Sequence, residues 1–408
     1  MKNLKKNFFS ASFCVFSGII FSQTKISIET AIETALKNNS LLKSERLKSD
    51  YKKELIKSSL TIAPTTISGD YGQINSFYND TKFGISQTLN FPSVYSNQKK
   101  VYSEEWKSAV LNVAVKEAEL KKAVNQSFFL LLYLDEKQKL LQRSDSIFSE
   151  FLKKSDLRFK KGESNILEKT TAETHRGTIK IQLLQLFQDK QIAQVQFQLL
   201  LNEEQILEPK SKVLQLQFSK TIDTISLQQH PNFKILEQYE KVAKANTKLE
   251  KTKLLPNFTI GYNNNSFIGT GADNLVYDKL NRFHSVQIGL GVPLFGGSQI
   301  AKIKALKIVE AISKNEFQNL KKVFINQYKS LLFQYQNNLE KIAYYKKTGL
   351  PNAKIIEEAA NKQYFNGDIN YLDWTLLINQ SITIKNNFIE TVLTNNQNII
   401  ELNYLLSK

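Results

Sequence analysis

Few residues of this chain have the chemistry of a catalytic or metal-binding site. The three histidines, His175, His230 and His284, lie far apart in the sequence. Cys14 is the only cysteine of the 408 residues. The sequence contains no His-Glu-x-x-His motif, no phosphate-binding glycine loop and no Gly-x-Ser-x-Gly motif, and the glycines of 269–273 have the composition of a loop. We therefore expect no enzyme activity, no catalytic residues, no cofactor and no metal site.

Two acidic residues stand out instead by their spacing from glycine. Glu168 follows Gly162 by six residues, and Asp373 follows Gly367 by six residues. Each glycine ends a long stretch of helical pattern, and glycine accepts the positive φ that a chain reversal requires. The simplest interpretation is a helix C-cap followed by a solvated acid near the N-terminus of the next helix.

The two glycine motifs belong to an internal repeat that covers most of the chain. Three pairs of segments match: 64–69 with 256–261, 83–89 with 288–294, and 159–168 with 364–373. The last two pairs are both shifted by 205 residues, and the first pair by 192. The thirteen extra residues of the second copy fall in the Asn- and Gly-rich stretch 263–282. Such an insertion is what a hairpin loop tolerates.

Each copy predicts a helix, two short strands, a very long helix, the glycine turn and another long helix. Only seven prolines and fifteen glycines interrupt the chain, which favours long helices. The first helix is expected at about 28–60 in one copy and 226–254 in the other. Residues 298–348 contain neither proline nor glycine and have an apolar period near that of a helix. They predict one unbroken helix about 75 Å long, at about 1.5 Å per residue, packed in a bundle.

The expected strands of the second copy alternate apolar residues with small or polar ones. Their apolar positions are Phe258, Ile260, Val286, Ile288, Leu290 and Val292. Four strands cannot close a membrane barrel alone, because about eight is the smallest common number. Two alternatives stay open from the pattern: a barrel shared between chains, or a small antiparallel sheet within one chain.

The N-terminus has the pattern of a secretory signal peptide over residues 1–23: three lysines, an apolar run and a small residue for cleavage. Cys14 lies inside the apolar run, so a lipoprotein anchor is not expected. Loss of the three lysines would lower the formal charge from +17 to +14. The remaining lysines alternate with Glu, Gln and Asn along the helices, which indicates a solvated surface and not a nucleic-acid-binding face.

The duplicated order resembles the TolC-like outer-membrane factors of tripartite efflux pumps and type I secretion systems. The segments that carry the resemblance are 292–297 with its weaker copy 89–92, 364–373 with its copy 159–168, and the turns at 38–40 and 229–231. The last two sit where the family often has a proline turn in its first helix. The resemblance extends over essentially all of residues 24–408.

The resemblance implies a mainly α fold with a small β part, assembled as a homotrimer in the outer membrane of a Gram-negative cell. Each chain would give four strands to one twelve-stranded barrel, whose apolar face meets lipid and whose loops 73–82 and 263–282 lie outside the cell. The helices would continue into the periplasm as a hollow coiled-coil tunnel. The implied organisation is a signal peptide (1–23), a first repeat (about 24–202), a linker (203–221) and a second repeat (222–408).

The resemblance also places Gly162 and Gly367 at the periplasmic tip, where the family closes its tunnel and meets a periplasmic adaptor. Tyr364 would bond to Glu168 as a closing link. Three copies of Asp373 would form a ring across the pore, and such a ring favours cations.

Two positions depart from the family pattern. The arginine expected two residues after the second glycine is Ile369, and a pore acid expected nine residues after it is Leu376. The expected gate therefore lacks part of its polar latch. Either Trp374 and its apolar neighbours help to close it, or the gate is looser.

The implied function is a passive exit duct that carries small toxic compounds or metal ions outward from an adaptor and an inner-membrane transporter. An alternative within the family is the duct of type I protein secretion. An alternative of another class is an exported coiled-coil adaptor or scaffold without a pore. The paired strands and the expanded loop argue against that last alternative.

Overall fold

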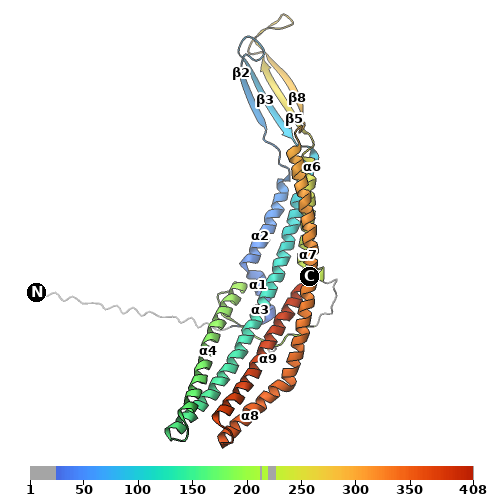
Figure 1. Ribbon diagram of the computed structural model, residues 1–408. Helices are drawn as coiled ribbons and strands as arrows, with labels where there is room; N and C mark the ends of the chain where they lie inside the picture. Colours follow the sequence, from blue (N-terminus) through green and yellow to red (C-terminus); the bar gives the residue numbers. More distant parts are fainter. Residues whose placement is uncertain (1–23, 212–213, 219–226, 408) are drawn as a thin grey trace, which may run out of the picture.

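The sheet and the tips of the long helices lie at opposite ends of an extended molecule (Figure 1). The computed structural model describes residues 24–211, 214–218 and 227–407. The expected signal peptide, 1–23, and part of the expected linker lie outside the described residues.

The described helices follow the order expected from the repeat. Those of the first copy are α1 (Ile28–Asn38), α2 (Ser40–Leu55) with a 3₁₀ turn (Ile56–Ser59), α3 (Pro92–Lys160) and α4 (Ile166–Leu201). Those of the second copy are α6 (Pro231–Thr252), α7 (Gly297–Tyr344), a π-helical turn (Tyr345–Gly349), α8 (Leu350–Asn366) and α9 (Tyr371–Leu405). We call α3 with α4 the first helix pair and α8 with α9 the second helix pair.

The prediction of one helix over 28–60 is wrong, because the helix is interrupted at Asn39. The backbone of Asn39 leaves the helical region, and its side chain accepts a hydrogen bond from the N–H of Leu42 at 3.1 Å. Asparagine is a favoured N-cap because it satisfies such a free N–H. In the second copy, the helix expected over 226–254 is interrupted at 228–230: Leu227 is helical, and α6 begins at Pro231 with His230 as its N-cap; residue 226 lies outside the described residues.

The prediction of one α-helix over 298–348 is also wrong near its end. The regular helix stops at Tyr344, and Tyr345–Gly349 form a π-helical turn before α8. Pro351 has no N–H and its ring displaces the carbonyl four residues earlier, so the regular hydrogen-bond ladder cannot pass through it. The matching residue of the first copy is Ser146, and α3 runs through it as one helix of 69 residues.

One hairpin from each copy joins into a four-stranded antiparallel sheet. Its strands are β2 (Thr66–Gly72), β3 (Asp80–Leu89), β5 (Asn257–Ser266) and β8 (Arg282–Gly291), in the order β2-β3-β5-β8. The contact between β3 and β5 therefore joins the two copies, and β2 and β8 are the edges. Two short pairs lie outside this sheet: β6 (Gly269–Thr270) with β7 (Val276–Tyr277) in the connection between β5 and β8, and β1 (Thr24–Ile26) with β4 (Leu207–Pro209), which packs against α3 and α4 in the helical body.

The strand register collects the apolar side chains on one face. Directly paired residues share a face of a sheet. The three rows of the apolar face nearest the helices are Ile67, Ile85, Tyr262 and Val286; Gln87, Ile260 and Ile288; and Leu89, Phe258 and Leu290, in which Gln87 and the Tyr262 hydroxyl are the polar groups. The opposite face has the rows Ser68, Gly84, Asn263 and Ser285, and Thr88, Thr259 and Gly289. Val292, expected as a strand residue, lies just past the end of β8, while Asn263–Ser266, expected in a loop, belong to β5.

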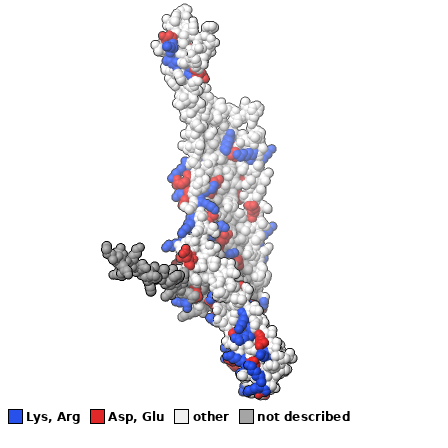
Figure 2. Space-filling model, turned by 90° about the vertical axis from the view of Figure 1, so that its left-hand side faces the viewer, with Lys and Arg blue, Asp and Glu red and all other residues white. Residues whose placement is uncertain are grey.

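The part of the sheet next to the helices carries no formal charge. The charged residues of the four strands are Asp70, Asp80, Lys82 and Arg282, and all lie at the end away from the helices. On the face shown in Figure 2, Lys, Arg, Asp and Glu lie over the helical body, over the tips and at the far end of the sheet. The narrow region between the helical body and the far end of the sheet shows none of them.

No helix of the described residues has a stretch both apolar and long enough to cross a membrane.

Candidate functional site

The chain reverses in the same way at the end of each helix pair. Gly162 has φ +74° and Gly367 has φ +85°. In each turn, the residue after the glycine donates its N–H to the carbonyl five residues back, at 2.8 and 2.9 Å, and the glycine N–H bonds to the carbonyl three residues back. This is the Schellman arrangement, which needs positive φ at the glycine. Contact of these turns with an adaptor stays a prediction.

Two asparagines that were not expected as site residues start the returning helices. Asn165 accepts a hydrogen bond from the N–H of Glu168 at 3.1 Å, and Asn370 accepts one from the N–H of Asp373 at 3.0 Å. Each therefore positions the acid of its turn. A signal was present in the sequence, because both asparagines lie three residues before the acid in both copies.

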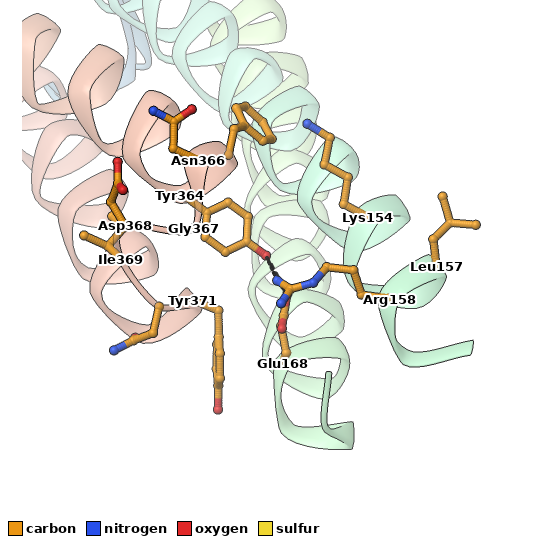
Figure 3. Close-up of a pocket in the computed structure, with 12 residues that line it drawn as sticks. Lys154, Leu157, Arg158, Glu168, Tyr364, Asn366, Gly367, Asp368, Ile369 and Tyr371 are labelled. Atoms are coloured by element: carbon orange, nitrogen blue, oxygen red, sulfur yellow. Dashed lines mark hydrogen bonds and ion pairs between the residues drawn. The ribbon is translucent and has the colours of Figure 1, made fainter. Parts of the chain in front are cut away.

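Tyr364 and Glu168 meet between the two helix pairs (Figure 3). The Tyr364 hydroxyl donates to Oε1 of Glu168 at 2.5 Å. The same oxygen lies 3.2 Å from Nη1 of Arg158 and 3.3 Å from Oγ of Ser155. Nη1 of Arg158 also lies 3.3 Å from the Tyr364 hydroxyl. We call Arg158, Glu168 and Tyr364 the tip link; that it closes a pore stays a prediction.

Burial, and secondly the bond to Glu168, raise the pKa of Tyr364 to about 12. The unfolded phenol titrates near 10. A raised pKa stabilises the folded form with the proton bound, so this contribution is complete below about pH 10 and is lost as the pH rises towards 12. Tyr364 is therefore a hydrogen-bond donor throughout the physiological range.

An aromatic cluster packs behind the tip link. Its members are Phe148 and Phe151 of α3, Tyr364 of α8 and Trp374 of α9. The ring of Trp374 lies 4.3 Å from that of Phe151 and 5.5 Å from that of Tyr364, between centroids. Trp374 is 3% exposed, and Ile369 packs against the same cluster. The apolar neighbours expected to help at the tip thus lie between the helix pairs.

A second charged contact joins the helix pairs farther from the tip. The carboxylate of Glu357 accepts from Nη2 of Arg143 at 2.6 Å, and its other oxygen pairs with Lys385. Glu357 is 6% exposed. Burial alone would raise its pKa, but the bonds from Lys385 and Arg143 outweigh that effect and lower it.

Asp373 and Leu376 lie outside the tip link. The Asp373 side chain is exposed and accepts a bond from Nδ2 of Asn370 at 2.7 Å. Leu376 is also exposed. A pocket of about 640 Å³, lined by both helix pairs, opens beside the tip link (Figure 3). No group of three or more His, Cys, Asp or Glu within the described part of the chain could hold a metal ion.

Replacing Tyr364 by phenylalanine is expected to loosen the tip without changing the fold. Glu168 would lose its shortest hydrogen bond, and loss of a bond to a buried charged group costs about 1.5–3 kcal/mol. If the tip link closes a pore, as the resemblance implies, the resting conductance of the reconstituted protein should rise, and this conductance is the measurement. Phe365→Leu, at a half-exposed neighbouring ring, is the control; equal conductance of wild type and Tyr364→Phe would contradict the link.

Comparison with known proteins places this geometry in a known fold. No protein-family model and no curated protein matches the sequence. Three of the similar solved structures are a membrane protein from Pseudomonas aeruginosa (14% identity, 93% of this chain and 90% of that chain, TM-score 0.79), the transmembrane channel protein CusC (16%, 93% and 92%, 0.77) and the open state of the MtrE outer-membrane channel of Neisseria gonorrhoeae (16%, 93% and 88%, 0.73). At these identities the likeness concerns the fold. This chain has the fold of the TolC-like outer-membrane channels.

Proposed function

We propose that this chain is the subunit of a homotrimeric outer-membrane channel, the passive exit duct of a tripartite efflux system for small toxic compounds or metal ions. The observation that carries the proposal is the two-faced sheet at the end of long helices. Its apolar rows suit lipid, its opposite rows are small and polar, and its outer strands β2 and β8 are edges. An open sheet edge is not tolerated in lipid.

Pairing β2 of one copy with β8 of the next removes these edges. Three copies would give a closed barrel of twelve strands with a polar interior. The helices would then extend on one side as a tunnel in the periplasm, and the tips would meet a periplasmic adaptor and its inner-membrane transporter. The similar folds of outer-membrane channels support this role.

The test is to express the full chain, isolate outer membranes, extract the protein in detergent, measure the oligomer mass and record it in planar bilayers. We expect a membrane-resident trimer with small, cation-preferring conductance. A soluble monomer or dimer would contradict the proposal and favour a scaffold with a sheet of its own.

Asp373 provides a sharper test of the pore. Exposed carboxylates from three chains at one constriction attract cations, so Asp373→Ala should reduce the cation preference measured by reversal potentials in a salt gradient. Asp368→Ala, which removes an exposed acid from the turn itself, is the matched control. Unchanged selectivity of Asp373→Ala would exclude the ring.

A further inference from the structure

Arg158 contacts both Glu168 and Tyr364, the two residues whose hydrogen bond joins the helix pairs at the tip. It extends from the last turn of α3, on the same helix pair as Glu168. One nitrogen, Nη1, lies 3.2 Å from Oε1 of Glu168 and 3.3 Å from the hydroxyl of Tyr364 on the other pair. Figure 3 shows the guanidinium between these two side chains.

The surroundings of Glu168 require a cation. Glu168 is 3% exposed, and a buried carboxylate is costly unless an opposite charge and hydrogen bonds compensate it. Tyr364 and Ser155 are neutral donors. Arg158 supplies the positive charge of this contact, and both its Nη1 and the Tyr364 hydroxyl donate to Oε1 of Glu168.

We propose that Arg158 is the positioning residue that keeps the tip closed at rest, by holding the side chain of Glu168 within reach of Tyr364. The proposal rests on the channel function proposed above and deepens it. The cation of the latch then comes from α3 of the first helix pair, while position 369, where an arginine was expected, contributes an apolar side chain to the aromatic cluster.

The geometry predicts how different side chains at 158 behave. The side chain of Arg158 is 43% exposed, so its replacement leaves no cavity and assembly should persist. Lysine retains the charge but has a single ammonium in place of the planar guanidinium with its several N–H donors. Arg158→Lys should therefore preserve part of the tip link. Glutamine removes the charge and should release the link.

The test compares planar-bilayer recordings of wild type, Arg158→Gln, Arg158→Lys and Lys153→Gln, each verified as a trimer by mass. Lys153 is an exposed lysine of the same helix outside the tip link, so its variant matches the loss of charge. A hydrogen bond to a charged group shifts a two-state equilibrium by about tenfold or more. We therefore expect about a tenfold larger open fraction for Arg158→Gln, an intermediate value for Arg158→Lys and no change for Lys153→Gln.

A double variant distinguishes positioning of Glu168 by Arg158 from a general loss of stability at the tip. Because Arg158 and Tyr364 act through the same carboxylate, Arg158→Gln added to Tyr364→Phe should open the channel little beyond Tyr364→Phe alone. Full additivity, or wild-type conductance of Arg158→Gln, would overturn the role of Arg158 while leaving the channel intact. A wild-type chain that forms no conducting trimer would instead overturn the proposed function, and this proposal with it.

Discussion

The Ile288→Arg variant is expected to lose most of the proposed outer-membrane trimer. Ile288 lies in the middle of β8, directly paired with Ile260 on the apolar face, and is 79% exposed in the single chain. An arginine facing lipid near the bilayer midplane costs about 2–4 kcal/mol, and the proposed homotrimer would contain three such arginines. The measurement is the amount of trimer recovered from outer membranes and its urea midpoint.

The neighbouring residue provides a matched control. Gln287 belongs to the same strand but lies on the opposite face, paired with Gly261. Gln287→Arg should therefore leave the trimer abundant and alter only its conductance. If both variants assembled equally well, the apolar face would not be a lipid face, and the alternative of a small sheet within one chain would be favoured.

The apolar face could be predicted from the sequence because strand residues alternate with a period of two. Val286, Ile288 and Leu290 show that period clearly. The sequence did not reveal which strands lie side by side, since pairing of β3 with β5 joins segments about 170 residues apart in the sequence and local patterns carry no information on such a contact. The contribution of Ile67 to the same row became visible only with the register.

The tip was predicted unevenly for a physical reason. Gly162 and Gly367 repeat at a fixed spacing and have a backbone role that only glycine fills easily, so their turns could be read from the sequence. Arg158 does not recur in the second copy, because the matching residue there is Gln363. Its partner across the tip, Tyr364, is 206 residues away, and only folding brings the two together.

The helix periodicity alone did not show the helix breaks; the resemblance pointed to turns at 38–40 and 229–231, and the break before Pro351 was missed. Asn39 is compatible with a helix interior at a small cost, and its capping bond in the folded chain shows that a new helix, α2, begins there. Pro351 is allowed in the first turn of a helix, as at the start of α8.

The Trp374→Ala variant is expected to have the largest effect on the tip. Trp374 is 3% exposed, and its indole N–H donates to Asn361 at 2.9 Å. Removing a buried tryptophan costs about 3–5 kcal/mol, and here the lost contacts join α9 to Phe148 and Phe151 of the first helix pair. The free energy of unfolding of the helical part, followed by circular dichroism, should fall by about that amount.

The same variant tests what holds the two helix pairs together. If the aromatic cluster and the tip link share this task, Trp374→Ala should also raise the resting conductance, because the side chain that supports Tyr364 is gone. Leu376→Ala is the control for stability only, because position 376 is itself expected to face the pore; Leu376 lies two residues farther along α9 and is 69% exposed, so the free energy of unfolding should change by less than about 0.5 kcal/mol. Equal effects of the two substitutions on stability would mean that the cluster adds nothing specific at the tip. A large loss of stability with unchanged conductance would assign closure to the tip link alone, where Arg158 and Glu168 meet Tyr364 without help from the indole ring.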